Sequence, residues 1–311
     1  MQGDSVRHRF LRLTTVVTAT LLLCLAATVP AANAQAPGRH HLPNLVVLGD
    51  SFASGVGNVP YQDTNPCKRS DSAYGPLLAR LHLVTLQAFV ACSGARTDQV
   101  WGPGPNGETP PQIDAITKDT DVVTVQALGN DFFVGAIEAL CFLPAPTLDC
   151  TLDTPFPANT PLSGQTVGSV VGSIALLAPG KLELLYGKID DKLGKKTKAR
   201  VITVGYPNIV GNGGPFCPGV TTEETQIAAK MVADLNTAIK NASNDHGYRF
   251  ASVDAIFRGH DACAGLLAIY PPLPHTFGFP ASQDESNQGA LHPNRLGQSF
   301  YAAAVAKRLF W

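Results

Sequence analysis

Five short runs of apolar and β-branched residues recur along the chain, at residues 45–48, 85–91, 122–128, 201–204 and 250–253. The stretches between several of these runs have apolar residues at helical spacing. Short apolar runs that alternate with amphipathic segments are typical of a parallel sheet flanked by helices. We therefore predict an α/β fold with five parallel strands.

Two helices can be placed from their spacing. Residues 221–224, Thr-Thr-Glu-Glu, form a capping box and precede Ile227, Met231, Leu235 and Ile239 at four-residue intervals, which predicts an amphipathic helix. A last helix is expected after Pro293, with Leu296, Phe300 and Ala304 on a face that packs the terminus back on the sheet.

The stretch 143–161 departs from this pattern, because it is dense in proline and threonine. Cys141 and Cys150 enclose part of it. Loops of this length are either lids or tolerated insertions. We favour a surface excursion held by a disulfide over an active-site lid.

The first 34 residues have the three parts of a secretory signal peptide. Arg7, Arg9 and Arg12 give a basic start, residues 13–29 are apolar, and residues 32–34, Ala-Asn-Ala, form a small-x-small cleavage site. A membrane anchor is the alternative, but no stop-transfer charges follow, and the stretch 35–39 is short, polar and proline-containing. We expect an exported protein without a stable membrane anchor.

The remaining residues, 35–311, are expected to form a single domain, since no repeat or linker divides them. Three arginines and one aspartate leave with the signal peptide, so the formal net charge moves from −1 to −3. No basic stripe remains to attract nucleic acid. We expect a monomer that binds no nucleic acid.

Six of the seven cysteines lie in the exported part of the chain. An even number in an exported protein indicates disulfides rather than a metal site, and no two of the six form a CxxC pair. Fifteen pairings are possible. Sequential pairing is favoured, because the first and last pairs would join neighbouring loops and the middle pair flanks one short loop: Cys67 with Cys92, Cys141 with Cys150, and Cys217 with Cys263.

Polar residues follow the first three apolar runs, where a parallel sheet binds its ligands. Ser51 follows the first run, Gly94 the second, and Asn130 and Asp131 the third. Each alone could be ordinary turn chemistry. Together they supply a nucleophilic hydroxyl and neutral donors for an oxyanion.

A serine hydroxyl also needs a base, and His292 in "LHPN" is the strongest candidate. The other histidines of the exported chain do not follow the pattern of a catalytic base. We expect structural or solvated roles for His40, His41, His82, His246, His260 and His275. The G-x-S-x-G motif of the larger α/β-hydrolase family is absent, since Ala53 replaces its second glycine.

The blocks "VVLGDSFASGVG", "CSGARTDQV", "LGNDFF" and "LHPN" resemble, in order and spacing, the four blocks of the SGNH (GDSL-type) hydrolases. The segments "CKRSDSAYGPLLA", "VITVGYPNIVG" and "GHDAC" resemble parts of the secreted actinobacterial lipases and esterases of that family. The resemblance implies a three-layer, flavodoxin-like sheet with helices on both faces, and it supports the sequential disulfides.

Transferred by position, the resemblance makes Ser51 the nucleophile and His292 its base. The backbone N–H groups of Ser51 and Gly94 and the Asn130 side chain would form the oxyanion hole. We expect Asp50 and Asp131 to anchor their turns rather than enter the chemistry. Neither a metal nor an organic cofactor is implied.

The last block departs from the family pattern. Members commonly have D-x-x-H, and the position of that aspartate is Gly289 here. A backbone carbonyl can orient an imidazole as well, although it stabilises the imidazolium less. The Gly289 carbonyl, or one next to it, is our first choice, and Asp284 and Glu285 are the rivals.

The sequence therefore predicts a secreted serine ester hydrolase of the lipase or esterase type. Phe132 and Phe133 are candidates for the acyl pocket, or core residues. Two alternatives stay open. One is a carbohydrate acetyl esterase of the same fold, and the other is a secreted binding module whose catalysis has lapsed.

Overall fold

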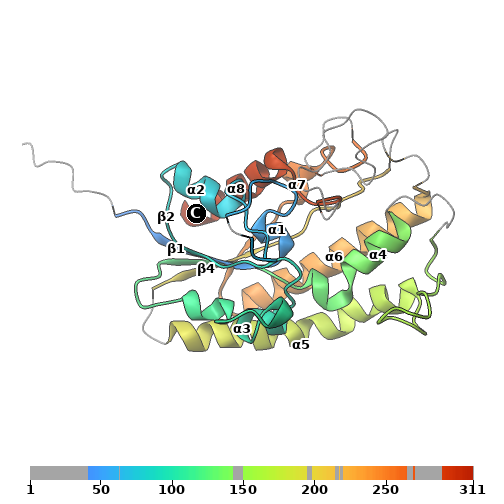
Figure 1. Cartoon of the computed structure of the whole chain (residues 1–311), viewed down its shortest axis with the longest axis horizontal. Coiled ribbons are helices and arrows are strands. Elements are labelled where there is room, and N and C mark those ends of the chain that lie inside the picture. Colours follow the sequence, from blue (N-terminus) through green and yellow to red (C-terminus); the bar gives the residue numbers. More distant parts are fainter. Residues whose placement is uncertain are drawn as a thin grey trace, which may run out of the picture. The chain divides into compact units, whose positions relative to one another are not determined.

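Five parallel strands form one sheet in the order β2-β1-β3-β4-β5, as seen in a computed structural model (Figure 1). The structure describes residues 41–62, 64–142, 150–194, 198–213, 217, 220–264, 269 and 289–310. The strands are β1 (Asn44–Gly49), β2 (Thr85–Phe89), β3 (Val122–Gln126), β4 (Arg200–Val204) and β5 (Arg249–Ala251). Each lies where an apolar run predicted it, so the five-stranded parallel sheet is confirmed.

The sheet is central to a three-layer structure (Figure 1). Its middle strands β1 and β3 are buried along nearly their whole length, because both sheet faces are covered. One face packs against α2 (Tyr74–Arg80) and α8 (Arg295–Phe310), and α7 (Asp254–Phe257) adjoins α8. The other face is covered by α3 (Thr97–Trp101), α5 (Val167–Leu193) and α6 (Thr222–Asp245).

Short elements lie in the connections. They are the helices α1 (Ser51–Ser54) and α4 (Val134–Cys141) and the 3₁₀ turns η1 (Pro105–Gly107), η2 (Gln112–Ala115) and η3 (Gly129–Phe132). Both α1 and η3 begin within three residues of the strand that precedes them. These abrupt changes of direction place polar residues at the carboxyl edge of the sheet.

The predicted amphipathic helix is α6. The Thr221 hydroxyl accepts from the Glu224 N–H at 3.2 Å, and the Glu224 carboxylate accepts from the Thr221 N–H at 2.8 Å. This reciprocal pair satisfies two N–H groups that a helix start leaves without partners. The four apolar residues used for the prediction are all buried.

The last helix, α8, begins after Pro293 as predicted, but its buried face differs from the predicted one. Leu296 is 38% exposed, whereas Gln298 is fully buried. The Gln298 amide donates to Phe52 O at 3.0 Å, and its oxygen accepts from Tyr74 N at 3.0 Å. A glutamine side chain is usually exposed to solvent, but these hydrogen bonds to backbone groups offset the cost of burying Gln298.

The longest helix, α5, was not predicted. Thr166 and Ser169 cap its start reciprocally, and nine residues at three- and four-residue spacings are buried along it. By length and composition alone α5 could also cross a membrane. In the structure its buried residues pack against α3 and α6, so it serves as a core helix.

The three predicted disulfides are present, with Cys67 bonded to Cys92, Cys141 to Cys150, and Cys217 to Cys263. Residues 143–149, in the proline-rich stretch, lie outside the described part of the chain. The described remainder is anchored, since Phe156 is 5% exposed and the Cys150 N–H donates to Glu224 at 2.9 Å.

Candidate active site

The polar residues after the first three strands are brought together by hydrogen bonds between their loops. The Cys92 N–H donates to Gly49 O and the Asp50 N–H to Gln126 O, both at 2.9 Å. The Asn130 side chain donates to Ala95 O at 3.0 Å. Segments that are distant in sequence thus meet at the carboxyl edge of the sheet, as expected.

A tight turn between β1 and α1 presents Ser51. Gly49 has φ +141°, and a Cβ added there would lie 2.3 Å from Gln126 O, so only glycine fits. The Gln112 side chain binds both backbone groups of Gly49, accepting from its N–H at 2.8 Å and donating to its carbonyl at 3.0 Å. Ser51 becomes the first residue of α1.

Asp50 caps α1 and joins this turn to β4. One oxygen of its carboxyl group accepts from Phe52 N at 3.0 Å, and the other accepts from the Tyr206 hydroxyl at 2.5 Å. Burial raises the pKa of Asp50 to about 7, although these hydrogen bonds lower it. Tyr206, which the sequence did not reveal, also accepts from the Gly129 N–H at 3.3 Å.

His292 faces Ser51 directly. Its Nε2 lies 2.8 Å from the Ser51 Oγ, although 241 positions separate the two residues in sequence. Asn58 holds the segment that carries the histidine, because its buried amide donates to Pro293 O at 2.9 Å. The Phe52 ring packs against the imidazole with centroids 4.9 Å apart.

The backbone carbonyl that contacts the other imidazole nitrogen belongs to Ala290, not to Gly289. The His292 Nδ1 lies 2.9 Å from Ala290 O, whereas Gly289 O accepts from the backbone N–H of His292 at 3.2 Å. Leu291 has φ +59°, a left-handed conformation that is costly for leucine. That turn directs the Ala290 carbonyl at the ring of His292. The rivals Asp284 and Glu285 lie outside the described residues.

This contact fixes the tautomer. A carbonyl oxygen can only accept, so Nδ1 carries the proton and Nε2 is the acceptor that faces the Ser51 hydroxyl. The ring is therefore poised as a base toward Ser51.

Three groups are candidate donors of the predicted oxyanion hole. Among the described residues, no acceptor is found for the backbone N–H of Ser51 or of Gly94. Gly94 has φ +82° and is exposed. The Asn130 amide uses one N–H on Ala95 O and lines the cavity beside Ser51. An oxyanion bound there would meet neutral donors.

Asp131 anchors the loop that carries Asn130. Its carboxylate accepts from the Thr97 N–H at 2.8 Å and the Thr97 hydroxyl at 2.7 Å, and Lys181 on α5 lies 3.1 Å away. These contacts connect η3 to α3 and α5 through Asp131, in agreement with its expected bracing role.

A cavity of about 60 Å³ adjoins Ser51 and His292. Its apolar walls are Val134 on α4, Pro207 and Ile209 after β4, and Met231, Val232 and Leu235 on α6. Neither Phe132 nor Phe133 lines it. Phe132 is core and Phe133 is 40% exposed, because the turn at η3 directs both rings elsewhere.

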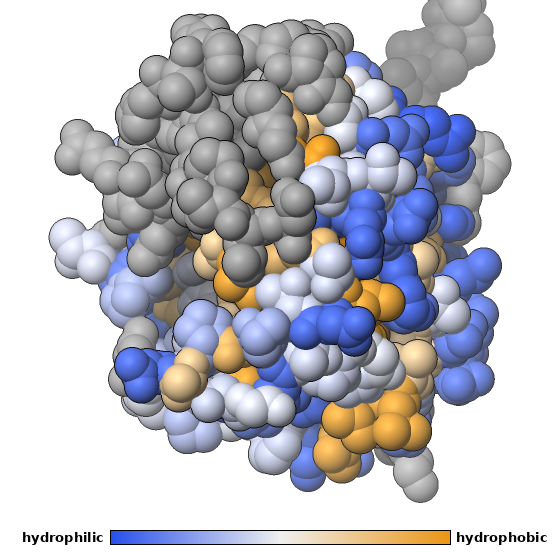
Figure 2. All heavy atoms as spheres, turned by 90° about the vertical axis from the view of Figure 1, so that its right-hand side faces the viewer, coloured by the Kyte–Doolittle hydropathy of each residue, from blue (hydrophilic) through white to orange (hydrophobic). Residues whose placement is uncertain are grey.

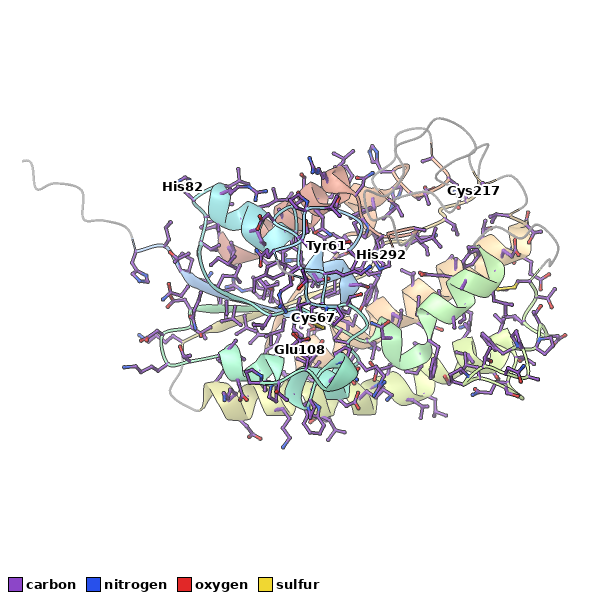
Figure 3. All side chains as sticks on the ribbon, viewed as in Figure 1. Tyr61, Cys67, His82, Glu108, Cys217 and His292 are labelled. Carbon is purple, nitrogen blue, oxygen red and sulfur yellow. A yellow bond between two sulfur atoms is a disulfide. The ribbon has the colours of Figure 1, made fainter. Side chains whose placement is uncertain are left out.

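The cavity lies at the carboxyl edge of the sheet, where His292 is found close to α1 (Figure 3). Figure 2 views the molecule from the side of α4 and the start of α6 and shows hydrophobic surface interspersed with hydrophilic areas. Figure 3 places His82 at the opposite end of the described fold, far from His292.

One group of three potential metal ligands occurs among the described residues. Ligand atoms of Cys67, Cys92 and Glu108 lie within 4.8 Å of one another, and Cys67 and Glu108 are close together in Figure 3. The two sulfur atoms are joined in a disulfide, so neither is a thiolate able to bind a metal.

Known proteins are similar to this chain in sequence. The model of the GDSL-like lipase/acylhydrolase family matches residues 47–300. A lipase of Streptomyces rimosus is 28% identical over 94% of this chain and 96% of its own length. Lipase 1 of Streptomyces coelicolor is 30% identical, with the same coverage of both chains.

Solved structures agree. The crystal structure of the extracellular lipase of Streptomyces rimosus superimposes with a TM-score of 0.64 and 26% identity, covering 86% of this chain and 99% of that one. The phospholipase A1 of Streptomyces albidoflavus, at 24% identity and a TM-score of 0.61, shares the fold over 86% of this chain and 99% of its own. By its family match over residues 47–300 and its full-length relatives, this chain belongs to the GDSL-like lipase/acylhydrolase family of ester hydrolases.

Proposed function

We propose that this protein is a secreted serine ester hydrolase in which Ser51 is the nucleophile and His292 its base. The observation that carries the proposal is the 2.8 Å contact between the His292 Nε2 and the Ser51 Oγ, within hydrogen-bond reach for proton transfer. Lipases among the relatives support an acyl ester as substrate.

The reaction follows from this geometry in two halves. The His292 Nε2 takes the Ser51 proton as Oγ attacks the acyl carbonyl, and the backbone N–H groups of Ser51 and Gly94 with the Asn130 amide stabilise the oxyanion. The imidazolium then protonates the leaving alcohol. In the second half, His292 deprotonates a water that attacks the acyl-enzyme; the bond between the acyl carbon and Ser51 Oγ breaks, the imidazolium returns its proton to Oγ, and the carboxylic acid leaves.

Export is part of the proposal. It is supported by the signal-peptide pattern in residues 1–34, by three disulfides, and by the extracellular lipase among the similar structures. Disulfides persist in oxidising compartments.

Turnover of a p-nitrophenyl ester tests the roles of Ser51 and His292. Ser51→Ala and His292→Asn should each lower kcat by roughly 10⁴-fold or more. Ser173→Ala and His82→Asn are matched controls, because Ser173 bonds within α5 and His82 is exposed at the far end of the fold. Full activity in either active-site variant would refute the assignment.

A fluorophosphonate probe and a series of acyl lengths separate the alternatives. Labelling of wild type but not of Ser51→Ala is expected, and an inert Ser51 would indicate a lapsed binding module. Hydrolysis of acetylated sugars with no activity on longer acyl esters would instead indicate a carbohydrate acetyl esterase.

A further inference from the structure

Glu138 is a buried carboxyl group in the wall of the cavity beside Ser51. It lies on α4 one turn after Val134, and Val134, Gly135 and Glu138 line the cavity together. Glu138 is only 7% exposed. Among the described residues its carboxyl group has no hydrogen-bond partner.

This isolation is unusual for a structural glutamate. Glu224, which is 2% exposed, accepts from the N–H groups of Cys150 and Thr221. In the described part of the chain, the fully enclosed side-chain oxygens without a hydrogen-bond partner are those of Gln126 and Asn208. The Glu138 oxygens are not among them, so this carboxyl group borders the open space of the cavity, where a ligand can reach it.

The surroundings of Glu138 favour the neutral form of its carboxyl group. Apolar side chains of α6, namely Met231, Val232 and Leu235, line the same cavity. Burial raises the pKa of Glu138 to about 8, and the nearby charge of Asp50 adds to this effect. A neutral carboxyl group both donates and accepts hydrogen bonds, so at neutral pH it can bind an oxygen atom of a ligand.

A plain hydrocarbon acyl chain and an acyl chain that carries an oxygen atom would interact differently with Glu138. A hydrocarbon chain in the cavity would displace water and leave the carboxyl group without a partner. A chain with an oxygen atom at the right depth would supply one. Sites built to bond a polar substrate group discriminate strongly against analogues that lack it.

We propose that Glu138 is a specificity-determining residue, which makes the cavity prefer acyl groups with a hydroxyl or carbonyl oxygen over plain hydrocarbon chains of equal length. The inference rests on the proposed function, since it takes the cavity to hold the acyl group that is transferred to Ser51.

Matched pairs of p-nitrophenyl esters test this preference. The pairs are pentanoate with 4-oxopentanoate, hexanoate with 5-oxohexanoate, and heptanoate with 6-oxoheptanoate. In wild type, kcat/KM should favour the oxo ester by roughly 5- to 50-fold in at least one pair. Equal values in all three pairs would overturn the proposal without any variant.

Two variants assign the preference to Glu138. Glu138→Leu should reverse the preference toward the hydrocarbon ester, whereas Glu138→Gln should keep it, because an amide can still donate. Glu223→Leu, at an exposed position of α6, is the control and should behave as wild type. An unchanged oxo preference in Glu138→Leu would refute the role of Glu138.

Labelling of Ser51 by a fluorophosphonate keeps the two proposals apart. An enzyme that is labelled and hydrolyses both members of every pair equally refutes only the specificity of Glu138. A protein that is not labelled and hydrolyses none of these esters refutes the proposed function itself.

Discussion

The acceptor of the His292 Nδ1 proton is the residue-scale feature with the clearest chemical consequence. In the described residues it is the Ala290 carbonyl, at 2.9 Å. A carbonyl fixes the tautomer as a carboxylate does, but it carries no charge to stabilise the imidazolium. A dyad of Ser51 and His292, with Asn130 and its neighbouring donors stabilising the oxyanion, stays our prediction, and the rival acids Asp284 and Glu285 lie outside the described residues.

The dyad predicts that the two rival acids contribute little to catalysis. Asp284→Ala and Glu285→Ala should change kcat by less than about threefold, while His292→Asn abolishes turnover. Hydrolysis of a p-nitrophenyl ester at saturating substrate measures this. A loss in either acid variant that is comparable to the loss in His292→Asn would replace the dyad with a triad.

Tyr206 is predicted to act by positioning. Tyr206→Phe removes the donor to Asp50 and the acceptor for Gly129 N–H, so the turns of Ser51 and Asn130 lose a shared support. We expect kcat to fall roughly tenfold with KM nearly unchanged, because alignment in the transition state is affected most.

Tyr248→Phe is the matched control for Tyr206→Phe. The Tyr248 hydroxyl donates to Asp190 at 2.6 Å, on α5 and away from the cavity, so its loss should leave both kinetic constants unchanged. A fall in kcat of similar size in both variants would show that general destabilisation, and not positioning, is responsible.

At the scale of elements, His246 joins α5 to the end of α6. Its Nδ1 lies 2.6 Å from Asp190 and its Nε2 lies 3.1 Å from Glu183. Partial burial lowers the pKa of His246, but the hydrogen bonds to the two carboxylates outweigh this and raise it above 6.5. A protonated imidazole thus stabilises the packing of the two longest helices.

The sign of the pH effect follows from that shift. Because the folded state raises the pKa, the stabilisation is complete below the unfolded value near 6.5 and is lost as pH rises through the folded value. His246→Gln should therefore lower the free energy of unfolding at pH 6 by only about 1 kcal/mol, because solvent screens the partly exposed carboxylates. At pH 9 the imidazole is neutral, so the substitution should change the free energy of unfolding very little.

Urea unfolding at the two pH values measures the effect of His246→Gln. His82→Asn is the control, because His82 is exposed. The same loss of stability at pH 6 and pH 9 would mean that His246 acts by packing against Tyr186 and Tyr248 rather than by charge.

The elements also differ in how well the sequence predicted them. The strands and α6 were found because local runs and a capping box carry the signal. For α8 the wrong face was chosen, since Gln298 is buried by partners on α1 and α2. The start of α5 has a local signal of its own, since Thr166 and Ser169 cap it reciprocally.

At the scale of the whole molecule, the disulfides close loops of different length. Cys217 and Cys263 are separated by 46 positions and Cys141 and Cys150 by 9. Loop-closure entropy predicts a loss of roughly 4 kcal/mol for Cys217→Ala with Cys263→Ala, and of roughly 2.5 kcal/mol for Cys141→Ala with Cys150→Ala. Urea unfolding of the two double variants checks the order, and a larger loss from the shorter loop would contradict it.

The sequence by itself determined the parallel sheet, the positions of Ser51, Gly94, Asn130 and His292 at its edge, and the cysteine pairs. Strand runs are local, and a parallel sheet brings the carboxyl ends of its strands to one edge whatever the loops do. The order of the four sequence blocks was therefore enough to predict that their polar residues lie at the same edge of the sheet.

The groups that support these residues could be identified only in the folded chain. The choice of Ala290 over Gly289 depends on the left-handed turn at Leu291. The contact of Tyr206 with Asp50 spans 156 positions, and Glu138 became notable because packing left its carboxyl group in the cavity wall without a partner among the described residues. Such contacts follow from how distant segments pack, and no local pattern in the sequence encodes them.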